Sequence, residues 1–433
     1  AYIENAGLFT AELLESTLLD PDFGYVSRPS VVSGPYRMVS YDAEAGKVEF
    51  AINEYYKGNS DNMKPSIENV TLLVVTNEEG VEMLRSGEMG LFNKTMKGST
   101  TSAGMEAVGE GKLRYKDYFR NGFSFVSYCC ERPAIAEQKV RQAIALCFDR
   151  DGFLLDYIGE ENGQRVDGYY GVGQWMYSML VSDPLKATET TVTITETEDG
   201  EITTEIETET IPLGDEEEEQ LGLNNVTSYT LDVETANKIL DEAGWTLNEQ
   251  GTAYDPAVDS VRCKKISGHL VSLNLSLVCP EETGVAPAFE TYMVPHLRQA
   301  GINLTVVPTK STELMKLYYE QEPRDCDMIY LASNFQHNFD PSMTFLPDGP
   351  NNYTNIDSQE LYDKAVAMRE TASGATDEYV RKWIQFQQVY MDILPAIPVY
   401  SNSYYDFYTT SLKNYDIALN PSWALAIVGA RLG

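Results

Sequence analysis

The sequence predicts an α/β protein whose largest part is built around a parallel sheet. The main observation is a regular alternation of strand-like and helix-like segments between residues 271 and 332. The strand-like segments are 271–278, 302–307 and 328–332, and the helix-like segments are 287–300 and 312–320. This β-α-β-α-β order is typical of parallel strands that are joined by helices on the faces of the sheet. The 433 residues, 43% of them hydrophobic, correspond to a globular chain of roughly two to three domains.

The part of the chain before this region is expected to begin with strands and continue with helices. Residues 30–57 have strand character, because Val48, Phe50 and Ile52 alternate with polar residues as in a half-buried strand. A second strand is expected over 70–75. Three helices are expected over 78–87, 134–148 and 232–244.

Polar residues, glycines and a proline mark the ends and breaks of the predicted helices. Asn77 is the expected N-cap of the first helix, and Gly87 is the expected stop. Asp232 and Gly244 have the same roles for the helix over 232–244. Pro295 lies inside the helix over 287–300 and predicts a kink there.

The last hundred residues predict two more helices and a final strand. The helices are expected over 359–370 and 377–392. The prolines of the segment 394–398, LPAIP, then favour an extended backbone. The tyrosine-rich stretch that starts at Val399 is typical of a strand.

An acidic segment interrupts the alternation. Residues 187–219 hold 13 acidic and no basic residues. Asp199 and Gly200 lie between two alternating runs of threonine and apolar residues, which is a strong hairpin signal. We therefore expect a two-stranded hairpin over 190–210, within an insertion of about 187–222.

The net charge of −34 argues against nucleic acid as a partner, because such a field repels phosphate backbones. No apolar run approaches the roughly 20 residues that span a bilayer. The six cysteines include no C-x-x-C pair, and there are only three histidines. We therefore predict packed thiols, no metal site and no cofactor.

Catalytic motifs are missing from the sequence. It contains no G-x-S-x-G, no H-E-x-x-H and no Walker loop. Gly168, Gly171 and Gly173 do not have the spacing of a dinucleotide fingerprint. We therefore expect a protein that is not an enzyme.

The loop after the strand 328–332 is the best candidate for a ligand-binding site. In open α/β sheets, ligands bind outside the carboxyl ends of the strands. Asn334, Phe335, Gln336 and His337 supply amides, an aromatic ring and an imidazole there. Small-molecule sites combine apolar walls with a few polar anchors in this way. Asp340, which precedes Pro341, is expected to cap a turn instead.

Six motifs, spread over most of the chain, carry a resemblance to a known family. They are residues 34–41 (GPYRMVSY), 53–58 (NEYYKG), 82–88 (EMLRSGE), 139–145 (KVRQAIA), 236–245 (ANKILDEAGW) and 394–400 (LPAIPVY). In this order they resemble the family 5 extracellular solute-binding proteins, the oligopeptide- and dipeptide-binding receptors of ABC importers.

The resemblance implies a type II periplasmic-binding-protein fold, in which two lobes close on a ligand like a clamp. Residues 1–125 and 401–433 would belong to lobe I, and residues 126–400 would form lobe II. The crossing near Tyr128 adds this residue to the expected ligand contacts. Only about 33 residues precede Gly34, so we expect a C-terminal fragment with one complete α/β lobe and part of the other.

The resemblance also implies a function as the binding component of an ABC importer, for oligopeptides or peptide-like solutes. His337 occupies the place where peptide-binding members carry an aspartate for the peptide's amino terminus, so this contact stays open. The alternatives are a non-peptide solute, such as a metal chelate or an oligosaccharide, and a surface sensor or interaction protein with the same fold. The expected partner is a membrane permease, and the expected protein is a monomer. It would be periplasmic or a cell-surface lipoprotein, with its anchor or signal outside this chain.

Overall fold

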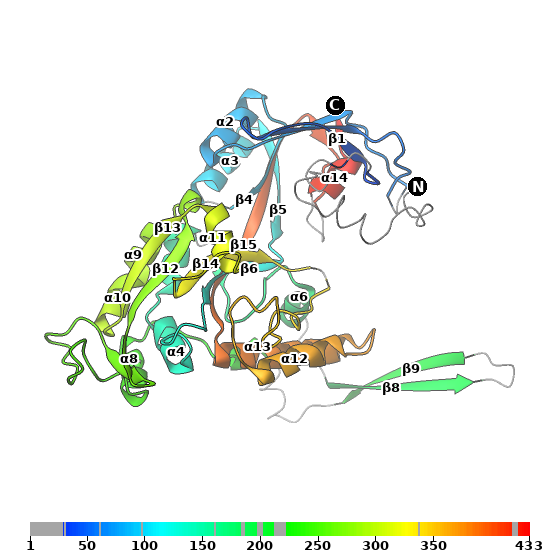
Figure 1. Ribbon diagram of the computed structural model, residues 1–433. Helices are drawn as coiled ribbons and strands as arrows, with labels where there is room; N and C mark the ends of the chain where they lie inside the picture. The colour runs from blue at the N-terminus through cyan, green and yellow to red at the C-terminus, as the bar shows by residue number, and fades with distance from the viewer. Residues whose placement is uncertain are drawn as a thin grey trace, which may run out of the picture. The chain divides into compact units, whose positions relative to one another are not determined.

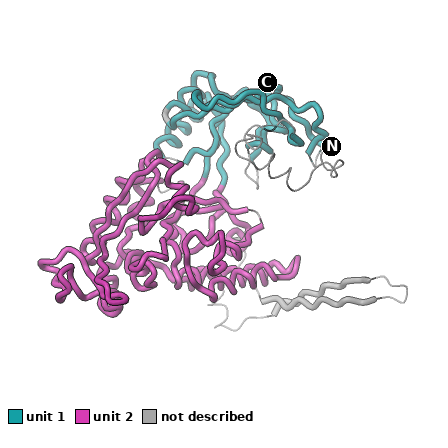
Figure 2. The backbone as a smooth tube through the Cα atoms, viewed as in Figure 1, with its two compact units in different colours: residues 1–118, 404–433 teal, residues 119–403 magenta. Residues whose placement is uncertain are grey.

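The computed structural model describes residues 29, 32–59, 62–96, 98–159, 162–182, 187–196, 202–211, 222–336, 338–417 and 423–433. The chain forms two compact units (Figure 2). Unit 1 consists of Ala1–Tyr118 and Tyr404–Gly433, and unit 2 is Phe119–Ser403. The chain thus passes from unit 1 to unit 2 and back. The assignment of these units to the lobes of a clamp stays a prediction.

Unit 2 is built on a mixed sheet with the strand order β13-β12-β14-β6-β15 (Figure 1). The strands are β12 (Asn274–Pro280), β13 (Asn303–Thr309), β14 (Met328–Asn334), β6 (Gly122–Tyr128) and β15 (Ala396–Thr409). The pairings of β12 with β13 and with β14 are parallel, which confirms the predicted β-α-β-α-β unit. The sheet is not parallel throughout, because β6 is antiparallel to both β14 and β15.

Most helices of unit 2 lie close to their predicted positions, whereas α5 and α6 were not predicted from the sequence. They are α4 (Gln138–Leu146), α5 (Arg150–Tyr157), α6 (Trp175–Ser182), α8 (Val233–Glu242), α9 (Ala286–Tyr292), α10 (Val294–Gln299), α11 (Ser311–Tyr318), α12 (Gln359–Arg369) and α13 (Thr376–Ile393). The break expected at Pro295 is confirmed, because the helix predicted over 287–300 is divided at Met293. Asp232 is the N-cap of α8, and its side chain accepts a hydrogen bond from the Thr235 N–H.

One continuous hydrophobic core fills unit 2. It includes the fully buried rings of Trp245, Trp383 and Phe289, together with Val140, Ala143 and Ile144 of α4. All six cysteines are buried as free thiols. The short strands β7 (Gly163–Arg165), β10 (Cys263–Ile266) and β11 (His269–Ser272) complete the unit.

Unit 1 contains an antiparallel sheet and a helical layer. The sheet has the order β1-β2-β3, with β1 (Tyr36–Asp42), β2 (Lys47–Ile52) and β3 (Asn69–Leu73). The other elements are α2 (Asn77–Ser86), β4 (Leu91–Thr95), α3 (Gly98–Gly109), β5 (Leu113–Phe119), β16 (Leu412–Lys413), α14 (Trp423–Gly429) and β17 (Arg431–Leu432). β15 continues into this unit and pairs there with β4 and β5.

The predicted N-cap of α2 is wrong by one residue. Thr76 is the N-cap, because its hydroxyl accepts the Glu79 N–H at 3.3 Å. The Glu79 carboxylate accepts the Thr76 N–H at 3.0 Å in return. This reciprocal capping box satisfies two N–H groups that Asn77 would leave unpaired. The predicted stop at Gly87 is confirmed by its left-handed φ of 80°.

The predicted hairpin is confirmed by the pairing of two strands. β8 (Ala187–Glu196) and β9 (Ile202–Ile211) are antiparallel over their whole length, and together they form a separate two-stranded sheet. The expected turn at Asp199-Gly200 lies outside the described residues. Among the described residues, no helix is both long and apolar enough to cross a membrane.

Candidate functional site

The predicted site loop begins where β14 ends, next to the start of β6. Asn334 is paired with Gly122 in the antiparallel register of these two strands. A Cβ atom on Gly122 would lie 2.0 Å from the Ser333 carbonyl oxygen, so only glycine allows this approach. The loop therefore begins beside Gly122, close to the point at which the chain enters unit 2.

A buried arginine holds Asn334 in place. Arg120 is 2% exposed, and its Nε donates to the Asn334 side-chain oxygen at 2.9 Å. Its Nη2 donates to the Ser333 carbonyl at 2.9 Å, and Nη1 donates to the Asn402 amide oxygen at 3.2 Å. Asn334 itself is exposed, so this geometry turns its amide nitrogen away from Arg120 and leaves it available as a donor.

Phe335 is anchored at both its backbone and its ring. Its N–H donates to the Asn121 carbonyl at 2.6 Å, and its carbonyl accepts from the Asn121 side-chain nitrogen at 2.9 Å. The ring stacks on Phe123 with centroids 5.6 Å apart and lies 4.8 Å from Tyr169 and 5.0 Å from Phe339. Because Phe335 is only half-buried, part of its ring is open to solvent.

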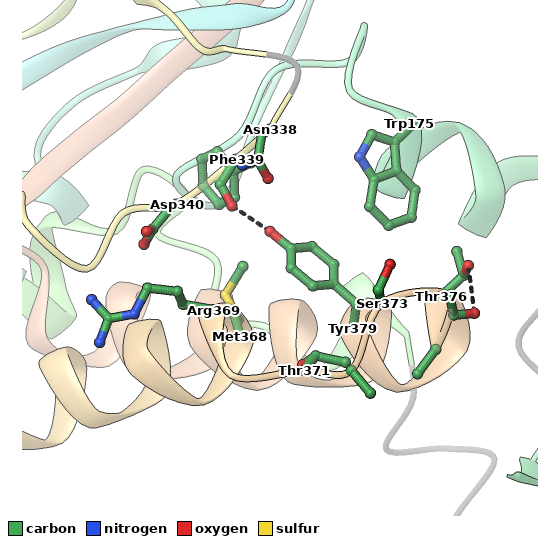
Figure 3. Close-up of a pocket in the computed structure, with 13 residues that line it drawn as sticks. Trp175, Asn338, Phe339, Asp340, Met368, Arg369, Thr371, Ser373, Thr376 and Tyr379 are labelled. Carbon is green, nitrogen blue, oxygen red and sulfur yellow. Dashed lines mark hydrogen bonds between the residues drawn. The ribbon is translucent and has the colours of Figure 1, made fainter. Parts of the chain in front are cut away.

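The remaining residues of the loop have different surroundings. Gln336 is exposed, and His337 lies outside the described residues. The expectation for Asp340 is confirmed, because its Oδ1 accepts the Ser342 N–H at 3.0 Å and closes a turn. Asn338, Phe339 and Asp340 also line a cavity of about 290 Å³ in unit 2 (Figure 3).

Tyr128 lies elsewhere, in the core of unit 2. Its side chain is fully buried, and its hydroxyl donates to the Arg141 carbonyl at 2.7 Å. Burial raises the pKa of this hydroxyl well above its ordinary value. A side chain without exposed surface offers no contact to a ligand in this arrangement, and a role of Tyr128 as a ligand contact stays a prediction.

Sequence reasoning missed Arg120 and Asn121, which position the loop. The only local signal is the polar Arg-Asn-Gly sequence before the apolar strand β6. The Asn121 side-chain oxygen is buried and has no hydrogen-bond partner among the described residues. An unsatisfied buried acceptor is costly and uncommon in native proteins. It is therefore an available acceptor beside the site loop.

The segment with Gly171 and Gly173, which lacks the spacing of a dinucleotide motif, packs against the residues that position the site loop. The Gly173 N–H donates to the Arg120 carbonyl at 3.0 Å. A Cβ atom on Gly171 would lie 2.1 Å from the backbone nitrogen of Gly122, and one on Gly173 would lie 2.6 Å from the Phe119 oxygen. These glycines thus let one backbone segment pack directly on another.

We expect Gly171→Ala to displace this segment from β6, because a methyl group cannot occupy the space of a backbone atom. Overpacking of this kind lowers the free energy of unfolding by about 1–3 kcal/mol or more. Urea denaturation of unit 2 measures the loss. Gly90→Ala is the matched control, because a Cβ atom there meets no atom within 4 Å. Equal stability of the two variants would contradict the close packing of Gly171.

The charges at the site suit neutral polar ligands. Asn334, Phe335 and Gln336 bring amides and a ring, and the first carboxylate of the described loop is that of Asp340. In the part of the chain that the structure describes, no group of three or more His, Cys, Asp or Glu side chains could hold a metal ion. The arrangement can donate and accept hydrogen bonds and can contact apolar groups, which are the features of a solute-binding protein.

The family model of the bacterial extracellular solute-binding proteins, family 5, matches residues 8–355, and the chain belongs to this family. No curated protein matches the chain in sequence. The fold is that of type II periplasmic binding proteins, and three solved structures illustrate it.

The first is the oligopeptide-binding protein AppA from Bacillus subtilis in complex with a nonapeptide, with a TM-score of 0.68, 14% identity, and coverage of 93% of this chain and 66% of that one. The second is lactococcal OppA with an endogenous peptide. Its TM-score is 0.70 and its identity 14%, and the match covers 96% of this chain and 69% of OppA. The third is NikA from Brucella suis with Fe(III)-EDTA. Its TM-score is 0.59 and its identity 14%, and the match covers 93% of this chain and 68% of NikA. The chain thus spans about two-thirds of the length of these structures.

Proposed function

We propose that this chain is the solute-binding component of an ABC importer and captures oligopeptides or peptide-like solutes without catalysis. The observation that carries the proposal is the loop after β14, which presents Asn334, Phe335 and Gln336 at the carboxyl end of a parallel β-α-β-α-β unit. Membership of a solute-binding family supports it, as do the structural neighbours that hold peptides.

The chemistry of this loop matches that of a peptide backbone. Each peptide unit offers one N–H donor and one carbonyl acceptor. The Asn334 amide nitrogen can donate to a carbonyl, and the Gln336 amide can donate and accept. The open part of the Phe335 ring offers an apolar surface for a side chain. These contacts read the backbone and require no particular peptide sequence.

The amino terminus of a peptide has no obvious partner in the described part of the loop. An ammonium group is best paired with a carboxylate. The first carboxylate of the described loop, that of Asp340, lines the cavity of about 290 Å³, which Asn334, Phe335 and Gln336 do not line. His337, the remaining position of the predicted site, is a weak partner for an ammonium because a neutral imidazole carries no charge. The proposed site therefore binds peptides with a blocked amino terminus as well as free ones.

The cellular setting follows from the same proposal. A binding component of this family delivers its solute to a membrane permease, so it works outside the cytoplasm, either in the periplasm or as a cell-surface lipoprotein. It would act as a monomer, since one site serves one solute. A second candidate function is capture of a non-peptide solute. The likeness to NikA with Fe(III)-EDTA favours a metal chelate, since the described residues offer no metal cluster of their own.

The test starts with native mass spectrometry of the full-length receptor, purified without denaturation, to identify the bound solute. Calorimetry with that solute then compares the wild type with Asn334→Ala and Gln336→Ala. We expect each variant to bind about 5- to 150-fold more weakly, which corresponds to about 1–3 kcal/mol for a lost hydrogen bond. Phe335 is left unchanged, because its ring also packs in the aromatic cluster.

Gln299→Ala is the matched control, since Gln299 is an exposed glutamine at the end of α10 in the same unit. Wild-type affinity in both site variants, with the fold intact, would place the site elsewhere. A co-purified metal chelate or oligosaccharide would replace the peptide proposal by the second candidate.

A further inference from the structure

The cavity of about 290 Å³ in unit 2 is a separate feature from the proposed peptide site. It is open to solvent and is lined by the segment 338–340, the first residue of α6, the end of α12, the start of α13 and the turn between these two helices. Asn334, Phe335 and Gln336 do not line it. Its volume lies at the lower limit for small-molecule sites, which begin at about 300 Å³. It therefore suits a small solute.

Two opposite charges are fixed at one end of this cavity by the same buried residue. Ser342 is fully buried; its N–H donates to Asp340 Oδ1 at 3.0 Å, and its hydroxyl accepts from Arg369 Nη1 at 3.0 Å. Within the described part of the chain, Asp340 and Arg369 form no ion pair with each other or with another residue. Both side chains are exposed, so each keeps hydrogen-bonding atoms for a solute.

Two aromatic rings, those of Tyr379 and Trp175, form another part of the wall. Tyr379 and Trp175 pack against each other with ring centroids 5.4 Å apart. The Tyr379 hydroxyl donates to the Phe339 carbonyl, which fixes the ring. Burial, together with the nearby Asp340 carboxylate, raises the pKa of Tyr379, so the hydroxyl stays protonated. Figure 3 shows Asp340 and Arg369 at one end, Trp175 at the other and Tyr379 between them.

We propose that this cavity binds a zwitterionic amino acid with an aromatic side chain. The ammonium group pairs with the Asp340 carboxylate, and the solute's carboxylate pairs with the Arg369 guanidinium. The side chain lies along Tyr379 toward Trp175. A solute with only one of the two charges leaves Asp340 or Arg369 without its partner. The net charge of −34 disfavours a purely anionic solute in any case.

The experiment is calorimetry of the full chain with L-phenylalanine as the probe. Because both charged groups are exposed, we expect weak binding, with a Kd on the order of 0.1–1 mM. N-acetyl-L-phenylalanine lacks the ammonium charge, and L-phenylalaninamide lacks the carboxylate. Each of these two analogues should bind at least about 5-fold more weakly than L-phenylalanine. The affinity for L-alanine, which lacks the ring, should be lower by a similar factor.

Variants assign the binding to this cavity. Arg369→Gln should weaken phenylalanine binding by about 5- to 20-fold and Asp340→Asn by a similar factor. Arg298→Gln, at an exposed arginine on α10, is the matched control and should have no effect. Equal affinity for phenylalanine and its two blocked analogues, unchanged binding in both cavity variants, or no binding at millimolar concentration would each overturn the proposal. Gln336→Ala should leave phenylalanine binding unchanged, so this proposal and the peptide proposal can fail separately.

Discussion

Replacement of Arg150 by methionine should lower the free energy of unfolding of unit 2 by about 3–5 kcal/mol, the usual cost of removing one partner from a buried charge network. Arg150 is 2% exposed. Its Nη2 donates to Asp167 Oδ1 and to the Tyr229 carbonyl, both at 2.7 Å. Its Nη1 donates to the carbonyls of Pro398 at 2.8 Å and Val166 at 3.2 Å. Methionine fills a similar volume but donates to none of these four acceptors.

Thermal unfolding, followed through the buried Trp245 and Trp383 of unit 2, measures this loss. For a unit of this size we expect the Tm to fall by roughly 6–15 °C. Arg150→Lys should have an intermediate effect, because an ammonium keeps the charge but cannot reach four acceptors in a plane. Arg298→Met is the matched control for an exposed arginine, with an expected change within about 0.5 kcal/mol. A Tm of Arg150→Met within the error of that control would refute the role of the network.

Removal of the Asp406 side chain should destabilise unit 1 by a comparable amount. Asp406 is fully buried on β15. Its carboxylate accepts the Lys94 N–H at 2.8 Å, the Tyr118 hydroxyl at 3.0 Å and the Tyr415 hydroxyl at 2.5 Å. Asp406→Ala removes the acceptor of all three donors, of which Tyr415 is a buried residue, at roughly 1–3 kcal/mol for each donor that water cannot reach. Trp423, on α14 of the same unit, can report the unfolding by fluorescence.

A second variant, Asp406→Asn, separates the effect of the Asp406 charge on the stability of unit 1 from the effect of its hydrogen bonds. The measurement is the pH dependence of stability. Burial raises the pKa of Asp406, and the bonds from Tyr415, Lys94 and Tyr118 offset only part of this shift. A raised folded-state pKa favours the protonated form. Its contribution to stability is complete below the unfolded pKa of about 3.9 and is lost as the pH rises through the folded value.

The neutral amide that Asp406→Asn introduces does not titrate and therefore does not undergo this loss. We expect the stability of Asp406→Asn relative to wild type to increase as the pH rises above the unfolded pKa of about 3.9, and to level off above the raised folded-state pKa. Denaturant titrations at several pH values measure the difference. A constant difference across this range would contradict the direction of the Asp406 shift.

Several features of the fold could be predicted from the sequence because they leave local patterns in it. The β-α-β-α-β unit, the break at Pro295 and the hairpin around residues 190–210 all depend on local patterns, and the structure confirms them. The predicted N-cap Asn77 was wrong because Thr76, one residue earlier, can form a reciprocal pair with Glu79. That choice depends on side-chain geometry rather than on residue type.

The candidate site was only partly readable. The loop after β14 was selected because a strand followed by amides and a ring is a local signal, and its role as a ligand site stays a prediction. Tyr128 was selected by its place between lobes in the related proteins, whereas the structure buries it against the Arg141 carbonyl. Arg141 belongs to one of the family motifs, and its side chain bonds the carbonyls of Ile393 and Leu394 at the end of α13. No local pattern indicates such a partner.

The sequence by itself determined the strands and helices of the β-α-β-α-β unit and the helices α4, α8, α12 and α13, because the period of apolar residues follows from the geometry of each element. It did not indicate α3, α5, α6 or α14. It also determined the family, through six short motifs in order. The tertiary structure alone decided that Arg120 holds Asn334, 214 residues further along the chain. It also decided that Gly171 packs on Gly122, and that Ser342 fixes Asp340 and Arg369 side by side. The physical reason is that such contacts depend on strand register and on which backbones approach each other, and neither leaves a periodic trace in the sequence.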